Sequence, residues 1–245
     1  MSRIVAGINP VAEAIKARPD EIEKVLCSLK EGPKLQFIKN ACREKRIRFI
    51  PEEKRRLDEI SGNANHQGVA AMVSDFSYCH VNDIIENWKK SGKRALVLVL
   101  DGIEDPQNLG AIIRSAESAG VNGIIIPKNR AASVTSTVEK VSAGAVEHVK
   151  IAMVTNTART IEELKAAGLW IAGADATGDK TIYETDLDSD LAVVVGSESK
   201  GMRPGVKKSC DFIISIPMHG KINSLNASVS TALIIFEAVR QRKMP

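Results

Sequence analysis

A carboxylate, two amides and an arginine lie close together between Asp105 and Arg114. A helix is expected over about 106–119, and helical side chains lean toward the N-terminus of their helix. We therefore expect the Arg114 guanidinium to point back at the crevice where this helix begins. Helix capping alone accounts for Asp105 and Pro106, because aspartate caps helices and proline suits their first position. Capping leaves Asn108 unexplained, and simple solvation is the alternative reading for Arg114.

Two further polar groups follow apolar runs later in the chain. In Val195-Gly-Ser-Glu-Ser-Lys-Gly-Met-Arg203, Gly196 lets the backbone approach a ligand closely, and Glu198 lies beside it. The alternative is an exposed turn whose charges have no role. In the other group, polar side chains crowd the boundary between a loop and the last helix: Asn223, Ser224, Asn226 and Ser228. One of them is needed as the helix cap, and the surplus indicates hydrogen bonds to a polar ligand.

The elements around these groups alternate between strands and helices. Strands are expected at 95–100, 123–126, 148–154, 169–174, 192–195 and 212–216, with helices at about 106–119, 133–142, 157–167 and 226–242. Unbroken apolar strands separated by helices predict an α/β domain with a parallel sheet covered on both faces. Ligands bind at the carboxyl ends of such strands, where all three polar groups lie. One face of the last helix carries apolar side chains: Val229, Ala232, Leu233, Phe236 and Val239.

A smaller α/β unit precedes this domain. Its expected strands are 22–26, 46–50 and 67–73, and its helices lie near 11–15, near 35–41 and from Pro51 toward Ile60. The polar stretch 76–93 is interpreted as a linker with a short helix near 81–88. The predicted organisation is therefore a unit at 1–75, a linker at 76–93 and the larger domain at 94–245. The small unit carries a basic cluster: Arg46, Arg48, Lys54, Arg55 and Arg56. It suits contact with nucleic-acid phosphates, and the alternative is a solvated helix face balanced by Glu52 and Glu53.

The composition, and departures from known motifs, argue against several classes of function. The charge of +4 permits nucleic-acid binding, while 4% aromatic residues argue against extensive base stacking. The four cysteines and four histidines are scattered, so neither a zinc site nor a disulfide framework is indicated. Gly173–Thr181 departs from a P-loop because Asp179 precedes Lys180, and the dinucleotide-binding glycine fingerprint is absent. No signal peptide or membrane-spanning run is visible, and we expect a cytoplasmic protein without membrane association.

The three polar groups, in order, resemble the signature motifs of the SpoU-type (TrmH-like) RNA ribose 2′-O-methyltransferases of the SPOUT class. The matching residues are Asp105-Pro-x-Asn108-x-Gly110-x-x-x-Arg114, then Gly196-Ser-Glu198-x-x-Gly201, then Ile216-Pro217-Met218…Ser224-Leu225-Asn226. One departure is Ser199-Lys200, since many members carry a glycine after the glutamate. The first unit is similar to the family's small substrate-binding domain at Gly7-Ile-Asn-Pro-Val11 and His66-Gln-Gly-Val69. The resemblance implies a SPOUT catalytic domain with a C-terminal trefoil knot, preceded by a small α/β RNA-binding domain.

The resemblance also implies a reaction and a site. S-adenosylmethionine would be the methyl donor, and the reaction would need no metal. The acceptor would be the 2′-hydroxyl of a guanosine in large-subunit (23S) ribosomal RNA. Implied donor-binding residues are Gly196, Ile216, Met218 and Leu225, with the strand end at 174–176 nearby; implied catalytic residues are Arg114, Asn108, Glu198, Ser224 and Asn226. A homodimer is implied as well. The alternatives are a transfer RNA substrate, or an RNA-binding or ribosome-assembly protein without activity.

Family mechanisms assign proton removal from the 2′-hydroxyl to the arginine, here Arg114. An arginine is protonated at neutral pH, and removing its proton would cost about 8 kcal/mol. Our interpretation is that Arg114 holds the adjacent phosphate and stabilises the developing alkoxide by its charge. The other catalytic residues would orient the arginine, the hydroxyl and the donor.

Overall fold

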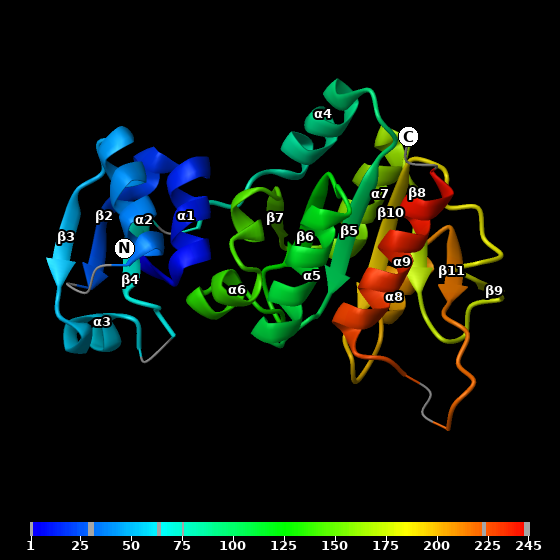
Figure 1. Ribbon diagram of the computed structural model, residues 1–245. Coiled ribbons are helices and arrows are strands. Elements are labelled where there is room, and N and C mark those ends of the chain that lie inside the picture. Colours follow the sequence, from blue (N-terminus) through cyan, green and yellow to red (C-terminus); the bar gives the residue numbers. More distant parts are fainter. Residues whose placement is uncertain (1, 29–31, 63–64, 75, 222–223, 243–245) are drawn as a thin grey trace. The chain divides into compact units, whose positions relative to one another are not determined.

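The computed structural model describes residues 2–28, 32–62, 65–74, 76–221 and 224–242, and Figure 1 labels its elements. Contacts divide the chain into two units, Met1–Ser77 with Val134–His148, and Tyr78–Ser133 with Val149–Pro245. Each unit has its own sheet. The boundaries 1–75, 76–93 and 94–245 stay predictions, with one feature that they did not include. The segment Val134–His148 packs with the first unit, although the chain on both sides of it belongs to the second.

The first unit is built on a four-stranded sheet in the order β1-β4-β2-β3. The strands are β1 (Ser2–Ala6), β2 (Ile22–Ser28), β3 (Phe49–Glu52) and β4 (Val69–Ser74); the helices are α1 (Ile8–Ala17), α2 (Pro33–Glu44), α3 (Lys54–Ile60) and α6 (Ser136–Val141), with short 3-10 turns η1 (Pro19–Glu21) and η2 (Ala145–Glu147). The prediction that Pro51 opens a helix is wrong, because Pro51 lies in β3 and the helix begins at Lys54. An edge strand tolerates proline, since one of its sides forms no ladder.

Ion pairs hold α6 and η2 in the first unit. Arg3 in β1 pairs with Glu139, whose side chain is 2% exposed. The Nε atom of Arg18 lies 2.9 Å from an oxygen of Glu147, which is 3% exposed. Buried carboxylates need such partners, because an unpaired buried charge is strongly destabilising.

The second unit contains a seven-stranded sheet in the order β7-β6-β5-β10-β8-β11-β9. Its strands are β5 (Leu96–Asp101), β6 (Gly123–Pro127), β7 (Ile151–Val154), β8 (Trp170–Ala174), β9 (Lys180–Thr181), β10 (Leu191–Gly196) and β11 (Phe212–Ser215). Every neighbouring pair is parallel. The prediction of a parallel sheet is therefore confirmed.

Helices cover both faces of this sheet (Figure 1). They are α4 (Val81–Ser91), α5 (Pro106–Ser118), α7 (Thr157–Ala167), α8 (Pro204–Lys208) and α9 (Ala227–Gln241). One hydrophobic core joins the sheet to α4, α7 and α8, while α5 and α9 pack against each other on the other face. Ile84 and Trp88 of α4 are buried in that core, so part of the expected linker belongs to the second unit.

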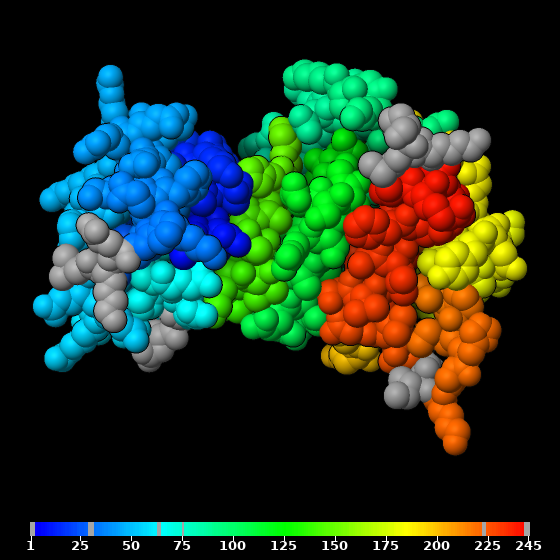
Figure 2. Space-filling model, in the orientation of Figure 1, coloured from blue at the N-terminus to red at the C-terminus, as the bar shows by residue number. Residues whose placement is uncertain are grey.

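The apolar face expected on the last helix is not the buried one. The buried residues of α9 include Thr231, Ile234, Ile235 and Ala238. Val229, Leu233 and Phe236 are 47%, 38% and 45% exposed. Figure 2 shows α9, in red and orange, uncovered on the near side of its unit.

Cys27, Cys42, Cys79 and Cys210 are free thiols in the structure. Burial disfavours the thiolate and raises the pKa of Cys42 and of Cys210 to about 11. Both thiols are therefore protonated and unreactive at neutral pH. In the part of the chain that the structure describes, no helix is both long enough and apolar enough to cross a membrane.

Candidate functional site

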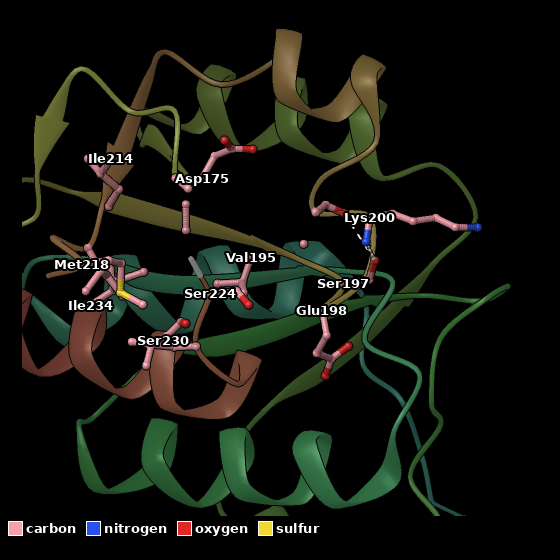
Figure 3. A pocket seen from close by; sticks show the side chains of 16 residues that line it. Asp175, Val195, Ser197, Glu198, Lys200, Ile214, Met218, Ser224, Ser230 and Ile234 are labelled. Carbon is pink, nitrogen blue, oxygen red and sulfur yellow. Dashed lines mark hydrogen bonds between the residues drawn. The ribbon is translucent and has the colours of Figure 1, made fainter. Parts of the chain in front are cut away.

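A pocket of about 330 Å³ opens at the carboxyl ends of β8, β10 and β11. Such volumes are ordinary for small-molecule sites, and this edge of a parallel sheet is where ligands bind. Figure 3 shows its lining, with Glu198 and Ser197 on one side and Met218 and Ile234 on the other. Apolar side chains and strand-end backbone dominate the wall: Ala174, Ala176, Val195, Gly196, Gly201, Ile214, Ile216, Met218, Leu225 and Ile234.

All four predicted donor-binding residues line this pocket, Gly196, Ile216, Met218 and Leu225, and so does the strand end at 174–176. They come from three segments, namely the end of β8, the end of β10 and the loop after β11. Gly196 ends β10 where the backbone turns back on itself, and a Cβ atom there would lie 2.5 Å from the Gly201 carbonyl oxygen and overlap neighbouring backbone atoms. Only glycine fits this position, because no real Cβ approaches backbone so closely.

A chain of hydrogen bonds joins the three predicted motifs. The amide of Asn108, in α5, donates from Nδ2 to Glu198 in the loop after β10. The Nδ2 atom of Asn226 donates to Oδ1 of Asn108 at 2.9 Å. The Oδ1 atom of Asn226 accepts a hydrogen bond from the Ser228 backbone N–H at 2.9 Å. Asn108 is only 8% exposed, so its amide orientation is set by these two partners. Asn226 therefore both caps the last helix and links Asn108 to the third motif.

The cap of α5 is the predicted residue, and the cap of α9 is one of the four candidates. Asp105 accepts a hydrogen bond from the Gln107 backbone N–H at 2.9 Å, and Pro106 is the first residue of α5. Asn226 is the cap of α9. Ser224 lies exposed on the pocket wall, whereas Asn223 lies outside the described residues.

Arg114 stands apart from this chain of bonds. Its side chain is exposed on α5, and the residues that line the pocket do not include it. Within the described ranges, no hydrogen bond or ion pair engages its guanidinium. The structure therefore leaves Arg114 as an exposed cation on the helix that also carries Asn108.

Two polar groups beside the pocket were missed from the sequence. Asp175 accepts hydrogen bonds from Thr177, and Lys207 lies 3.0 Å from its carboxylate. Burial opposes the charged carboxylate, but these hydrogen bonds and the lysine outweigh it and lower the pKa of Asp175. Asp101, at the end of β5, binds Arg203. Since each pair joins residues distant in sequence, only the position of the aspartates at strand ends could have indicated them.

Among the described residues, no cluster of histidine, cysteine, aspartate or glutamate side chains has the arrangement of a metal site. The charged residues that line the pocket are Glu198, Lys200 and Asp175, of which Asp175 is paired with Lys207, and most of the remaining wall is apolar. This arrangement suits a molecule with a cationic part and an apolar part.

Sequence comparisons cover both units. The profile of the SpoU rRNA Methylase family matches residues 95–236. The profile described as RNA 2′-O ribose methyltransferase substrate binding matches residues 4–79. A Staphylococcus aureus protein named as a TrmH family tRNA/rRNA methyltransferase is 43% identical over 244 residues, which cover 98% of this chain and 96% of that protein.

Solved structures share the fold of the whole chain. The SpoU methyltransferase AviRb from Streptomyces viridochromogenes, in complex with the cofactor AdoMet, has a TM-score of 0.83 at 25% identity, covering 98% of this chain and 90% of that one. An AdoMet-bound rRNA methyltransferase from Sinorhizobium meliloti has a TM-score of 0.82 at 23% identity, covering 98% and 87%. At that identity the second likeness concerns the fold alone.

Proposed function

Because the chain belongs to the SpoU rRNA methylase family and is an RNA methyltransferase, we propose that it methylates the 2′-hydroxyl of a guanosine ribose in 23S ribosomal RNA. The observation that carries the proposal is the hydrogen-bonded chain Glu198–Asn108–Asn226, which joins all three motifs beside one pocket. Glu198, at one end of this chain, also lines the pocket, so the three motifs are joined to a small-molecule site, which a protein that only bound RNA would not need. A transfer RNA remains the second candidate substrate, since the relative's name includes both RNA classes.

S-adenosylmethionine is the proposed donor, and the residues present fit it. Its adenosyl group needs apolar walls and close backbone, which Ile216, Met218 and Leu225 and the glycine at 196 provide. Glu198 lies at the same pocket and places a negative charge near a cationic ligand. The donor supplies a methyl group already activated on a sulfonium. The AviRb complex with AdoMet supports this choice.

The protein's own residues then act on the acceptor. In the overall reaction the ribose 2′-oxygen gains a bond to the methyl carbon, the sulfur–carbon bond breaks and the hydroxyl proton leaves to solvent. We propose that Arg114, which has a free guanidinium, binds a substrate phosphate and stabilises the developing oxyanion. Asn108, Glu198, Ser224 and Asn226 would hold the reacting groups in line.

Two measurements test this function. Calorimetry with S-adenosylmethionine should give saturable binding to the full chain, and absence of binding would refute the enzyme. Ribose-methylation mapping of RNA from a strain lacking the gene should then lack one 2′-O-methylguanosine in 23S ribosomal RNA, restored by complementation. Loss of a transfer RNA modification instead would establish the second candidate.

The basic cluster of the first unit is expected to contact RNA phosphates. Arg46, Arg48, Lys54, Arg55 and Arg56 are all exposed. Arg55 and Arg56 pair with Glu59 at 3.4 and 3.2 Å, not with Glu52 or Glu53, and such exposed pairs are weak enough to yield to phosphate.

Replacing Arg55 and Arg56 with glutamine should weaken RNA binding and reduce its salt dependence. Each lost phosphate contact lowers the slope of log affinity against log salt by about 0.7 to 0.9. Filter binding at several salt concentrations measures this. The same substitution of Lys89 and Lys93, which are exposed in the second unit, is the control. An unchanged slope in the Arg55 and Arg56 variant would mean a solvated surface only.

We also propose a homodimer formed through α9. Its exposed apolar residues Val229, Leu233 and Phe236 continue toward Leu225, which is 37% exposed. A groove of about 360 Å³ lies along them, lined by Tyr183, Ala232, Leu233, Phe236 and Glu237. Exposed apolar patches of this kind mark protein interfaces.

Changing Leu233 and Phe236 to aspartate should convert the dimer to a monomer, because charges in an apolar interface are costly to bury. Light scattering after size exclusion would show the mass fall by half. Trp170→Ser, which removes a more exposed apolar side chain elsewhere in the unit, should leave the mass unchanged. A wild-type protein that is already monomeric would end this proposal.

The remaining parts of the proposal concern topology and location. We propose that the loops after β10 and β11, which share the pocket, belong to a C-terminal trefoil knot. We also propose a cytoplasmic enzyme, since its RNA substrate is there. A crystal structure of the full chain tests the knot, and an unthreaded chain path through 191–242 would contradict it.

A further inference from the structure

A buried aspartate outside the three motifs lies at the centre of the second unit's carboxyl edge. Asp101 is the last residue of β5 and is 1% exposed. In the sheet it stands directly beside Gly196, the last residue of β10. Figure 1 shows these two strands side by side. Asp101 therefore lies at the point where the loop after β10 leaves the sheet.

The other end of that loop returns to the same carboxylate. The backbone N–H of Arg203 donates to Oδ2 of Asp101 at 2.8 Å, and its Nε donates to Oδ1 at 2.8 Å. The Nη2 atom of Arg203 also bonds to Asp101 and donates to Thr157 Oγ1 at 2.8 Å. One arginine thus occupies both carboxylate oxygens, which is the strong, directional form of this interaction.

The loop between these two points is closed on itself. Ser197 and Gly201 exchange backbone hydrogen bonds at 2.9 and 3.1 Å. The residues from 197 to 201 include Glu198, and the loop lines the pocket. Outside the loop, Glu198 is held by the amide of Asn108 and Met202 is buried in the core. The bonds from Arg203 to Asp101 add the anchor at the point where the loop returns to the sheet.

We propose that Asp101 is a positioning residue which, through Arg203, holds the 197–202 loop in the conformation that binds the methyl donor. It touches neither the donor nor the RNA. The inference rests on the proposed function for the identity of the donor, but the loop anchoring is a property of the protein alone. Asp101 would act on affinity for the donor and not on the chemical step.

The test compares Asp101→Asn with Asp211→Asn. Asp211 makes the same kinds of bond, accepting from the Ile171 backbone N–H at 2.8 Å and pairing with Lys165 at 2.8 Å, but it precedes β11 and so lies at the opposite end of the strands. We expect Asp101→Asn to raise the dissociation constant and KM for S-adenosylmethionine by about tenfold or more, with kcat at saturating donor changed less than about threefold. Asp211→Asn should leave both constants unchanged.

Amide hydrogen exchange of Ser197 and Gly201, measured without donor, gives a readout that is independent of activity. These two amides should exchange at least about tenfold faster in Asp101→Asn and at the wild-type rate in Asp211→Asn. Arg203→Lys, which keeps the backbone bond and the charge, should lie between wild type and Arg203→Ala in both readouts. If Asp101→Asn fails to fold, these two arginine variants carry the test.

The outcomes separate the two proposals. Wild-type exchange rates and donor affinity in Asp101→Asn, or equal effects of the two aspartate variants, would overturn the positioning role. A fall in kcat with KM unchanged would also contradict it. A wild-type protein that binds no S-adenosylmethionine would refute the proposed function, and faster exchange in Asp101→Asn would still support the anchoring of the loop.

Discussion

Replacing Arg114 with alanine should lower the rate of methyl transfer about 10²- to 10³-fold, the usual loss when one group that stabilises a developing oxyanion is removed. Donor affinity should stay within about twofold of wild type, because the pocket lining does not include Arg114. Single-turnover kinetics with labelled donor measures the rate, and calorimetry measures the affinity. The exposed arginine of α7, Arg159, is a matched control, and Arg159→Ala should behave as wild type.

Arg114→Lys separates an electrostatic role from a general base. Lysine keeps the charge but loses the planar fork that holds a phosphate, and it gives up its proton more easily than arginine. We expect low activity with a pH profile like that of the wild type. Activity near the wild-type level, with a basic optimum that lies at lower pH than that of the wild type, would favour the general base, because lysine loses its proton at lower pH than arginine. Unchanged activity in Arg114→Ala would remove Arg114 from the mechanism altogether.

Gly196→Ala should abolish detectable donor binding, with an affinity loss of about 100-fold or more. A methyl group at 196 would overlap the Gly201 and Met202 backbone, and backbone cannot move aside as a flexible side chain can. The loop that bears Glu198 must therefore shift. Calorimetry measures the affinity, and thermal unfolding measures the accompanying loss of stability.

Gly205→Ala is the control for this substitution. A Cβ atom at 205 meets no atom within 4 Å, and the residue lies in α8. Alanine is favoured over glycine in helices by up to about 1 kcal/mol, so the variant should be as stable as wild type or slightly more stable, with normal donor binding. Normal donor binding in Gly196→Ala would show that the close approach at 196 does not shape the pocket.

Local signals in the sequence predicted the second unit well. Unbroken apolar runs such as 95–100 correspond to buried parallel strands, and aspartate and asparagine at helix starts correspond to the caps Asp105 and Asn226. These features depend on neighbours in sequence. Local signals also placed the three polar groups at strand ends, because parallel strands bring their carboxyl ends to one edge. The individual donor-binding residues were implied by the resemblance to the SpoU-type family and not by these local signals.

Features that depend on distant partners were missed. Pro51 is tolerated in β3 only because that strand is at the edge of its sheet. Helical periodicity placed Val229, Leu233 and Phe236 on one face, but an apolar stripe does not say whether it faces its own sheet or another molecule. The bond between Asp101 and Arg203 joins residues far apart in sequence, and nothing local distinguishes either from a solvated charge.

The packing of Val134–His148 with the first unit has a consequence for how the protein can be dissected. The chain passes between the units at 77/78, at 133/134 and at 148/149, so cleavage at 77/78 does not separate them cleanly: Val134–His148 of the first unit stays covalently attached to the second. A fragment beginning at Tyr78 would expose Glu139 and Glu147 without Arg3 and Arg18, leaving two carboxylates stripped of their counter-ions. A gene that starts after the first 77 residues therefore encodes a second unit that still carries Val134–His148 without its packing partners. A second unit that folds on its own would need this segment removed or redesigned.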